Sequence, residues 1–543
     1  MYPNTLLHLG LADFSRIGSP ALLSELPGIG EGAGGSQSRI SPASPEIRLE
    51  QPEESEMDVD FDFSALLQVF LPHASRLHFS FHVPTFIQDS ACPEDDSLRP
   101  HRCLLSAVAL WALCIMGPDG EYSEYESRHL KLSLDALPTA HSSNAGRHRI
   151  QAIQTEVLLA LYFFNDSRIV EGRYHLSAAS TAVVVCGLHR LLASQDAPSS
   201  PTTLGSFPGL VLDMPRNALD LGERINLFWA VYALVRCWGV ALGSPPTIPD
   251  GPAQDVAIKS PIPKALDKYQ NVSVDEILSA EGFLVTSFFD GSADYSILTQ
   301  PSSSRVAFVI ATALFERATR IANSQSTIDA APSVEFIEEI ESFGRVITRF
   351  NDALREQVSP DPSVTSGKQH GTGTASEEGK LQQILTHSLG NAATLQLYFP
   401  LLGQDGADTQ CRNVIREIVA QIKHSWDLFQ DQLGKMDFFI GIIWLSAARV
   451  LLTQLAGITS PSPSASPSLT GSVPERPLVR SSTPEEASKE ARRQLIDILR
   501  AWEITEDLET LLNAIRRLGE TCPLIDMRSP LMGKLCTGYD GSL

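Results

Sequence analysis

The chain has 543 residues, 43% of them hydrophobic, which is enough to form one or two sizeable cores and excludes a chain that is disordered throughout. Its 42 Lys and Arg residues and 64 Asp and Glu residues give a net charge of −22, and no run of five or more basic residues occurs. Because the neutralisation of phosphates requires clustered cations, this composition disfavours nonspecific binding to nucleic acids.

The eight cysteines contain no C-x-x-C pair and no short cluster with histidine, so they support neither a zinc ribbon nor a disulfide framework. Such cysteines fit a reducing compartment, the cytosol or the nucleus. The N-terminus has no basic segment before an apolar one, and we do not expect secretion. The longest apolar run, 438–456, is interrupted by Arg449 and Gln454, which favours a buried helix over a membrane span.

Residues 1–60 are rich in Gly, Ser, Pro and acidic residues, and we expect them to form a disordered tail. From residue 61 onward apolar side chains recur every three or four positions, whereas alternation with a period of two is scarce. The predicted fold is therefore all-α, an irregular multi-helix bundle over 61–457. Such stripes predict helices at 63–72, 103–116, 150–164, 173–191, 222–242, 305–322, 334–355, 380–402, 411–430 and 436–456.

Three segments rich in Pro, Ser and Gly interrupt the helical pattern. Their composition cannot bury enough apolar area to offset the ordering of the chain. We predict long disordered loops at 193–221 and 358–379, and a disordered linker at 458–483.

The last region, 484–543, is predicted to be one long amphipathic helix followed by a tail. Ser482 or Thr483 can cap the helix, and Pro484 suits its first turn. Glu485 and Glu486 favour the positive end of the helix dipole. An apolar seam follows and ends at Gly519, formed by Leu495, Leu499, Trp502, Leu508, Leu512, Ile515 and Leu518. We expect this helix to dock on the body of its own chain; docking on a partner is the alternative.

Motifs that carry catalysis in helical proteins are missing. The stretch 95–99 ends in Arg99 where a magnesium-binding D-D-x-x-D face needs a carboxylate, and no G-x-S-x-G, H-E-x-x-H or P-loop motif occurs. His78 and His82, four residues apart, lack an obvious third ligand. We assign no catalytic and no metal-binding residue and expect a protein that is not an enzyme. A helical enzyme with a site assembled from scattered residues is the open alternative.

Three segments have a recognisable order and spacing. The first, 77–86, contains His82, Pro84, Thr85 and Phe86. The second, 172–190, contains Gly172, His175, Gly187, Leu188, His189 and Arg190, and its Gly187 suits a helix C-cap or a kink. The third, 223–246, contains Arg224, Phe228, Trp229, Arg236, Gly243 and Pro245.

Together these segments resemble the middle regulatory region of fungal binuclear zinc-cluster transcription regulators, the fungal-specific transcription factor domain. With a weaker fourth stretch, 392–402, and the helix behind it, the resemblance covers roughly 66–456. In the family the third segment contains an Asp-Arg pair and a Gly-Arg-Pro turn; here Val235 stands in place of Asp and Ser244 in place of Arg. The resemblance therefore does not extend to the contacts of that Asp and that Arg, but it does include the packing of Phe228 and Trp229.

The resemblance implies a nuclear regulator of transcription by RNA polymerase II. It implies contacts with the transcription machinery and homo- or heterodimers with related regulators, and no membrane. The family's DNA-binding module, six cysteines that hold two zinc ions, is missing, because no cysteine precedes Cys92. The chain itself needs no cofactor, and zinc and DNA would be bound only by a module upstream of it. Either the gene model starts too late, or the protein is a co-regulator that never contacts DNA.

Overall fold

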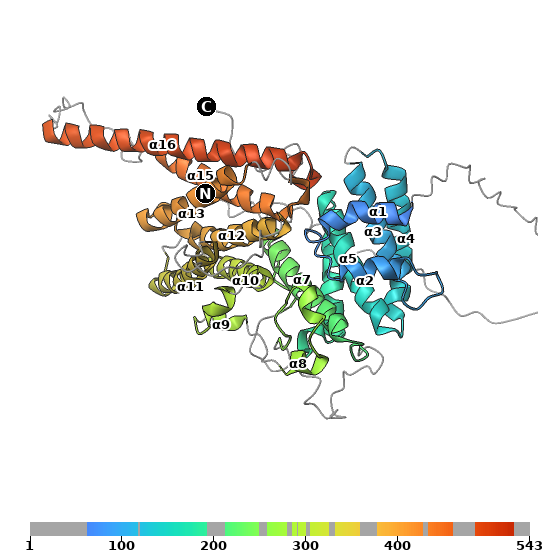
Figure 1. Ribbon diagram of the computed structural model, residues 1–543. Coiled ribbons are helices and arrows are strands. Elements are labelled where there is room, and N and C mark those ends of the chain that lie inside the picture. The colour runs from blue at the N-terminus through green and yellow to red at the C-terminus, as the bar shows by residue number, and fades with distance from the viewer. Residues whose placement is uncertain are drawn as a thin grey trace, which may run out of the picture.

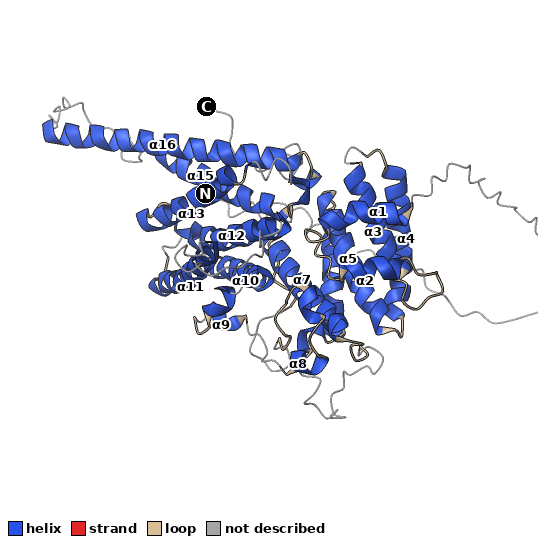
Figure 2. Cartoon of the chain, in the orientation of Figure 1, coloured by secondary structure: helices blue, strands red, loops and turns tan. Residues whose placement is uncertain are grey.

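The computed structural model of the protein describes residues 62–117, 120–192, 212–248, 258–279, 285–289, 291–299, 304–324, 332–358, 377–426, 433–459 and 484–525 (Figure 1). Throughout these residues the secondary structure is helical, without a strand (Figure 2). The predicted all-α class is confirmed. The predicted tail, 1–60, lies outside the described residues.

The N-terminal lobe, residues 62–192, is a group of six helices. They are α1 (Phe63–Phe70), α2 (Val83–Ser90), α3 (Arg102–Met116), α4 (Ser123–Ser142), α5 (Gly146–Asn165) and α6 (Ile169–Val185). Helix α5 packs against α3, α4 and α6 and is buried along almost its whole length. It therefore forms the axis of this lobe.

The central helix α7 (Ala218–Ala241) joins the two halves of the molecule, because it contacts α5 and α6 on one side and α10 on the other (Figure 1). Asn217 caps it, since its side chain accepts a hydrogen bond from the backbone N–H of Asp220. The predicted loop 193–221 is therefore too long: the cap starts the helix at Ala218. Short elements follow α7: η5 (Leu266–Tyr269), α8 (Val274–Leu278), α9 (Thr286–Phe289) and η6 (Tyr295–Thr299).

The C-terminal lobe, 304–525, is built around α12, which packs against α10, α11, α13 and α15. Its helices are α10 (Ser304–Ala322), α11 (Val334–Val358), α12 (Glu377–Tyr398), α13 (Asp405–His424), α15 (Phe439–Thr459) and α16 (Pro484–Gly519). Short 3-10 turns flank helices in both lobes: η2 (Leu71–His73), η3 (Leu188–Arg190), η7 (Phe399–Leu401), η8 (Leu433–Lys435) and η10 (Pro523–Ile525).

Two further predicted segments are shorter than expected. Helix α11 ends at Val358 and α12 begins at Glu377, so both ends of the predicted loop 358–379 are helical. Helix α15 ends at Thr459, inside the predicted linker 458–483. At the start of α12 the added residues include Glu377 and Glu378, whose high helix propensity extends the helix ahead of its first apolar residue at little cost.

The two lobes share one hydrophobic core that runs from Leu66 to Ile525. Trp238 of α7 stacks on Phe164 of the N-terminal lobe, with ring centroids 3.7 Å apart, and lies 5.8 Å from the ring of Phe439 in the C-terminal lobe. A polar contact lies nearby, where Nε2 of His78 is 3.1 Å from Oδ2 of Asp437. The lobes are thus joined by both apolar and polar contacts.

Helix α15 is the one described helix whose length and composition would allow it to cross a membrane. The core helix of a soluble protein passes the same test, and α15 packs against α12, α13 and α16. Side chains such as Ala447 and Leu451 are fully buried there.

Helix α16 docks on α13 and α15 over its C-terminal half only (Figure 1). Ile504, Leu511, Ile515 and Leu518 are buried in that half. Leu495, Leu499 and Trp502, predicted as part of the same seam, are 57%, 54% and 66% exposed. The expected docking on the body of the chain is therefore observed for the C-terminal half of α16 and not for its N-terminal half.

Candidate functional site

The first and third sequence segments meet at the N-terminal ends of α2 and α7. His82 precedes α2, and its backbone N–H donates a hydrogen bond of 2.9 Å to Oε1 of Glu223 on α7. Nδ1 of the His82 ring lies 2.8 Å from Oγ1 of Thr85. Pro84 occupies the first turn of α2, where its missing N–H has no cost. The start of α2 is therefore held directly on α7.

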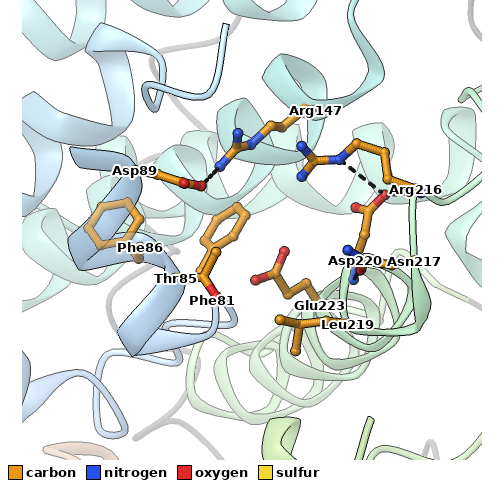
Figure 3. A pocket seen from close by; sticks show the side chains of 10 residues that line it. All are labelled: Phe81, Thr85, Phe86, Asp89, Arg147, Arg216, Asn217, Leu219, Asp220 and Glu223. Carbon is orange, nitrogen blue, oxygen red and sulfur yellow. Dashed lines mark hydrogen bonds and ion pairs between the residues drawn. The ribbon is translucent and has the colours of Figure 1, made fainter. Parts of the chain in front are cut away.

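A pocket opens beside this contact, between α2, the start of α5 and the start of α7 (Figure 3). It is small, with a cavity volume of about 40 Å³, and it opens to solvent. The lining is Phe81, Thr85, Phe86, Asp89, Arg147, Arg216, Asn217, Leu219, Asp220 and Glu223. It thus combines two guanidinium groups and three carboxyl groups with aromatic and aliphatic side chains.

Two of the three carboxyl groups have cationic partners. Asp89 forms an ion pair with Arg147. Asp220 accepts from Nη2 of Arg224 at 3.0 Å, and its Oδ2 lies 3.9 Å from Nε of Arg216. The Arg216 side chain is 50% exposed, so it remains accessible from solvent. Each aspartate therefore has at least one guanidinium group beside it.

Glu223 differs from the two aspartates, because it makes no ion pair within the described part of the chain. Burial, with a smaller contribution from the charge of Asp220, raises the pKa of Glu223 to about 7, although Arg147 and Arg216 act in the opposite direction. The carboxyl points into the space between the two arginines (Figure 3). Near neutral pH it can either donate or accept a hydrogen bond there.

The second sequence segment lies on α6 and the turn after it. A Cβ on Gly172 would lie 2.5 Å from the ring of Phe164, so glycine is what permits α6 to approach α5 this closely. His175 is buried, and its Nδ1 lies 2.6 Å from Oε2 of Glu156, whose other oxygen is 3.2 Å from Nε2 of His141. These histidines hold the pKa of Glu156 below its usual value despite burial. The arrangement ties α4, α5 and α6 together.

The sequence Gly-Leu-His-Arg, residues 187–190, follows the end of α6. Gly187 has a φ of +73°, the left-handed conformation typical of a helix C-terminus. Leu188 is buried, and its carbonyl oxygen accepts a hydrogen bond from the hydroxyl of Ser260. The carbonyl of His189 accepts from the backbone N–H of Lys259 at 2.7 Å, while Arg190 completes the 3-10 turn. The segment therefore anchors the chain that follows α7.

The rest of the third segment runs along α7. Phe228 and Trp229 are buried, and Nε1 of Trp229 donates to the carbonyl of Pro261 at 2.6 Å. Arg236 is fully buried; its guanidinium lies 3.4 Å from the ring centroid of Tyr232 and donates to the carbonyl of Ile248 at 3.2 Å. Val235 stands in place of the family's Asp, and a ring and a carbonyl oxygen are among the contacts of Arg236.

At the end of α7 the chain turns at Gly243, which has a φ of +63°, and Pro245 is exposed. An α-helix of 24 residues is about 36 Å long, so this turn is far from Glu223. The structure thus brings His82, Thr85, Phe86 and Arg224 together near the pocket, and distributes the other segment residues over the packing of α6 and α7.

Sequence reasoning missed the charged residues of the pocket, above all Asp89, Arg147, Arg216, Asp220 and Glu223. One signal was present: Asp220, Glu223 and Arg224 lie three and four positions apart at the start of an otherwise apolar helix. Asp89 and Arg147 are 58 residues apart in the sequence and become neighbours only in the fold. In the described ranges no group of three His, Cys, Asp or Glu side chains is arranged to hold a metal ion.

Comparison with known families relates this region to transcription. The family model described as fungal specific transcription factor domain matches residues 67–299. Comparison with curated proteins and with solved structures finds no match. The matched range contains the pocket and every residue of the three segments. The family model describes a transcription factor domain and not an enzyme family. Residues 67–299 of this chain are therefore similar to the fungal specific transcription factor domain.

Proposed function

We propose that this chain acts in the nucleus as the regulatory part of a regulator of RNA polymerase II transcription, and that it is not an enzyme. The observation that carries the proposal is the family match, which covers the N-terminal lobe and α7. The net charge of −22 further supports a role in protein contacts, because a phosphate backbone would be repelled. In this proposal the described helices regulate, and any DNA is bound by another module or another protein.

We further propose that the pocket is where a small ligand acts on the regulator. Arg216 offers an accessible cation to an anionic group, and Glu223 offers a hydrogen-bond donor or acceptor near neutral pH. A ligand there would contact α2 and α5 of the N-terminal lobe and the central helix α7. It would therefore favour one relative placement of these helices over others.

A tethering experiment tests the first proposal. The full chain is fused to a DNA-binding domain of unrelated origin in a fungal strain with a matching reporter gene, and its localisation is followed with a fluorescent tag. We expect nuclear accumulation and a several-fold change in reporter output relative to the DNA-binding domain alone. A cytoplasmic fusion with unchanged output would contradict the proposal.

The same strain tests the pocket. Arg216→Ala removes the accessible cation without a change in the core, and Arg516→Ala, an exposed arginine on α16, is the matched control. We expect the first variant alone to lose any dependence of reporter output on added metabolite extracts. Equal responses of the two variants would exclude the pocket as the regulatory site.

A second candidate is a co-regulator without DNA contact, which pairs with a complete regulator of the same family. The acidic charge favours it. Chemical crosslinking in nuclear extracts followed by mass spectrometry distinguishes the two. A co-regulator would be crosslinked to a zinc-cluster protein, whereas a regulator with its own module would be found on DNA without one.

A further inference from the structure

The N-terminal half of α16 carries an exposed apolar stripe. It consists of Leu495, Ile498, Leu499 and Trp502, which are 57%, 65%, 54% and 66% exposed. Their spacing of three, four and seven positions places them on one face of the helix. Most exposed apolar side chains of the protein occur singly, whereas these four adjoin each other, and such a patch marks a contact surface.

The stripe points away from the body of the chain. Leu495 precedes Ile504 by nine residues, which is two and a half helical turns, and Trp502 precedes it by slightly more than half a turn. Ile504, Leu511, Ile515 and Leu518 are buried against the lobe, so the stripe lies on the opposite face. The apolar face of α16 thus changes sides between Trp502 and Ile504, and α13 and α15 cannot cover both.

Two ion pairs mark where the helix leaves the body. Nη2 of Arg416 lies 2.7 Å from Oε2 of Glu503, and Nζ of Lys423 lies 3.0 Å from Oε1 of Glu506, with both cations on α13. On the N-terminal side of Glu503 the helix extends past α13 and α15 (Figure 1). A second helix could therefore lie along the stripe without meeting the rest of the molecule.

We propose that the stripe binds the same stripe of a second copy of this chain, with the two α16 helices antiparallel. The four positions are symmetric about a point between Ile498 and Leu499. A two-fold axis through that point places Leu495 against Trp502 of the second copy and Ile498 against Leu499 of the second copy. A large ring thus faces a smaller side chain at both ends of the contact.

The low net charge of this segment also favours the binding of a second copy of the chain. Over 484–503 there are four basic and five acidic residues, so the segment is nearly neutral in a chain of net charge −22. Two copies therefore approach here with the least repulsion. The two stripes together would bury on the order of 1,000 Å² of apolar surface, near the lower limit of specific interfaces. We expect a weak dimer, because interfaces of this size are typical of transient complexes.

The first test is the molar mass of the full chain by sedimentation equilibrium across 0.5–100 µM, a range of about two decades around a micromolar Kd. We expect a rise from 59.1 kDa towards twice that value as concentration increases. Leu499→Glu should raise the dissociation constant at least tenfold. Asn513→Glu introduces the same charge on the same helix outside the stripe and should leave it unchanged.

The second test is the register of the pair, with a short bismaleimide as the crosslinker and the wild-type chain as the blank. Leu499→Cys should crosslink to itself, because the two-fold axis passes beside it. Leu495→Cys alone should not, since its copies lie about seven residues, or about 10 Å, apart along the axis. A mixture of Leu495→Cys and Trp502→Cys should crosslink between chains.

Each result decides the proposal. A chain that stays monomeric at the highest concentration, or a dimer that Leu499→Glu does not weaken, overturns it. Self-crosslinking of Leu495→Cys indicates parallel helices and overturns the antiparallel arrangement. The proposal rests on α16 alone and not on the proposed function, so a dimer with an inactive reporter fusion would refute only the latter.

Discussion

Glu223 is a carboxyl group whose burial raises its pKa from 4.5 to about 7. At pH values between 4.5 and 7, Glu223 keeps its proton in the folded chain but has released it in the unfolded chain. The free energy of unfolding therefore decreases as pH rises from 4.5 to 7 through this group. Its contribution is about 2 kcal/mol at most, because part of the side chain faces the pocket.

Replacing Glu223 with Gln tests this. Glutamine resembles the protonated acid and can still accept the hydrogen bond from the backbone N–H of His82. We expect the variant to melt at a higher temperature than the wild type at pH 8 and at nearly the same temperature at pH 4.5. Glu338→Gln, at an exposed position of α11, is the control and should show no such difference. A lower melting temperature of Glu223→Gln at pH 8 would contradict the assignment.

At the scale of elements, two glycines determine how α6 is placed, for different reasons. Gly172 allows contact with Phe164, whereas nothing lies within 4 Å of a Cβ on Gly187. The need for glycine at Gly187 is therefore conformational, set by its positive φ. The sequence alone left a C-cap and a kink open at Gly187, and the structure gives it the backbone conformation of a helix end.

Substitutions at Gly187 distinguish a conformational requirement for glycine from a steric one. Gly187→Ala should lower the free energy of unfolding by about 1 kcal/mol, since a Cβ disfavours the left-handed region. Gly187→Asn should lower it by less, because asparagine tolerates that region. Urea denaturation followed by circular dichroism measures both. Equal losses for the two variants would point to a steric cause instead.

At the scale of the whole molecule, Asp437 joins the lobes. Its Oδ2 lies 3.1 Å from Nε2 of His78, and its Oδ1 accepts from the backbone N–H of Phe439 at 2.9 Å. Asp437→Asn keeps the acceptor for Phe439 and removes the charge, whereas Asp437→Ala removes both. We expect hydrogen exchange around 73–79 and 434–441 to accelerate in both variants, and more in Asp437→Ala. Unchanged exchange would show that the apolar contacts of Trp238 suffice to hold the lobes.

Acid should destabilise the whole chain through buried histidines. Burial lowers the pKa values of His73, His189 and His387 from 6.5 to about 4. Between pH 6.5 and 4 the unfolded chain binds protons that these three rings do not, so stability falls as pH falls. Glu223 changes the stability in the opposite direction, but it is one group against three histidines.

Urea denaturation between pH 4.5 and 6.5 measures this dependence. Replacing His387 with Leu should make the slope shallower, since one of the three groups is removed. His424→Leu, at the end of α13, is the control and should keep the wild-type slope. A wild-type chain whose stability is constant over this range would contradict the assignment.

The sequence by itself determined the helical class and most helix positions, because the period of apolar residues follows directly from the geometry of the α-helix. It also identified segments that lie within the matched domain, since the spacing of Phe228, Trp229 and their neighbours is local. Helix ends were less accurate: the helical starts at Ala218 and Glu377 depend on caps and propensity rather than on apolar spacing.

Only the tertiary structure decided the pocket and the role of α16. Arg147 pairs with Asp89 and lines the same pocket as Glu223 because α2, α5 and α7 converge, and no local pattern encodes that arrangement. In α16 the sequence predicts a single apolar seam, yet Leu495, Leu499 and Trp502 are exposed on the face opposite the buried Ile504, and the lobe ends near Glu503. Whether an apolar residue is buried depends on what lies opposite it, and that is a property of the fold.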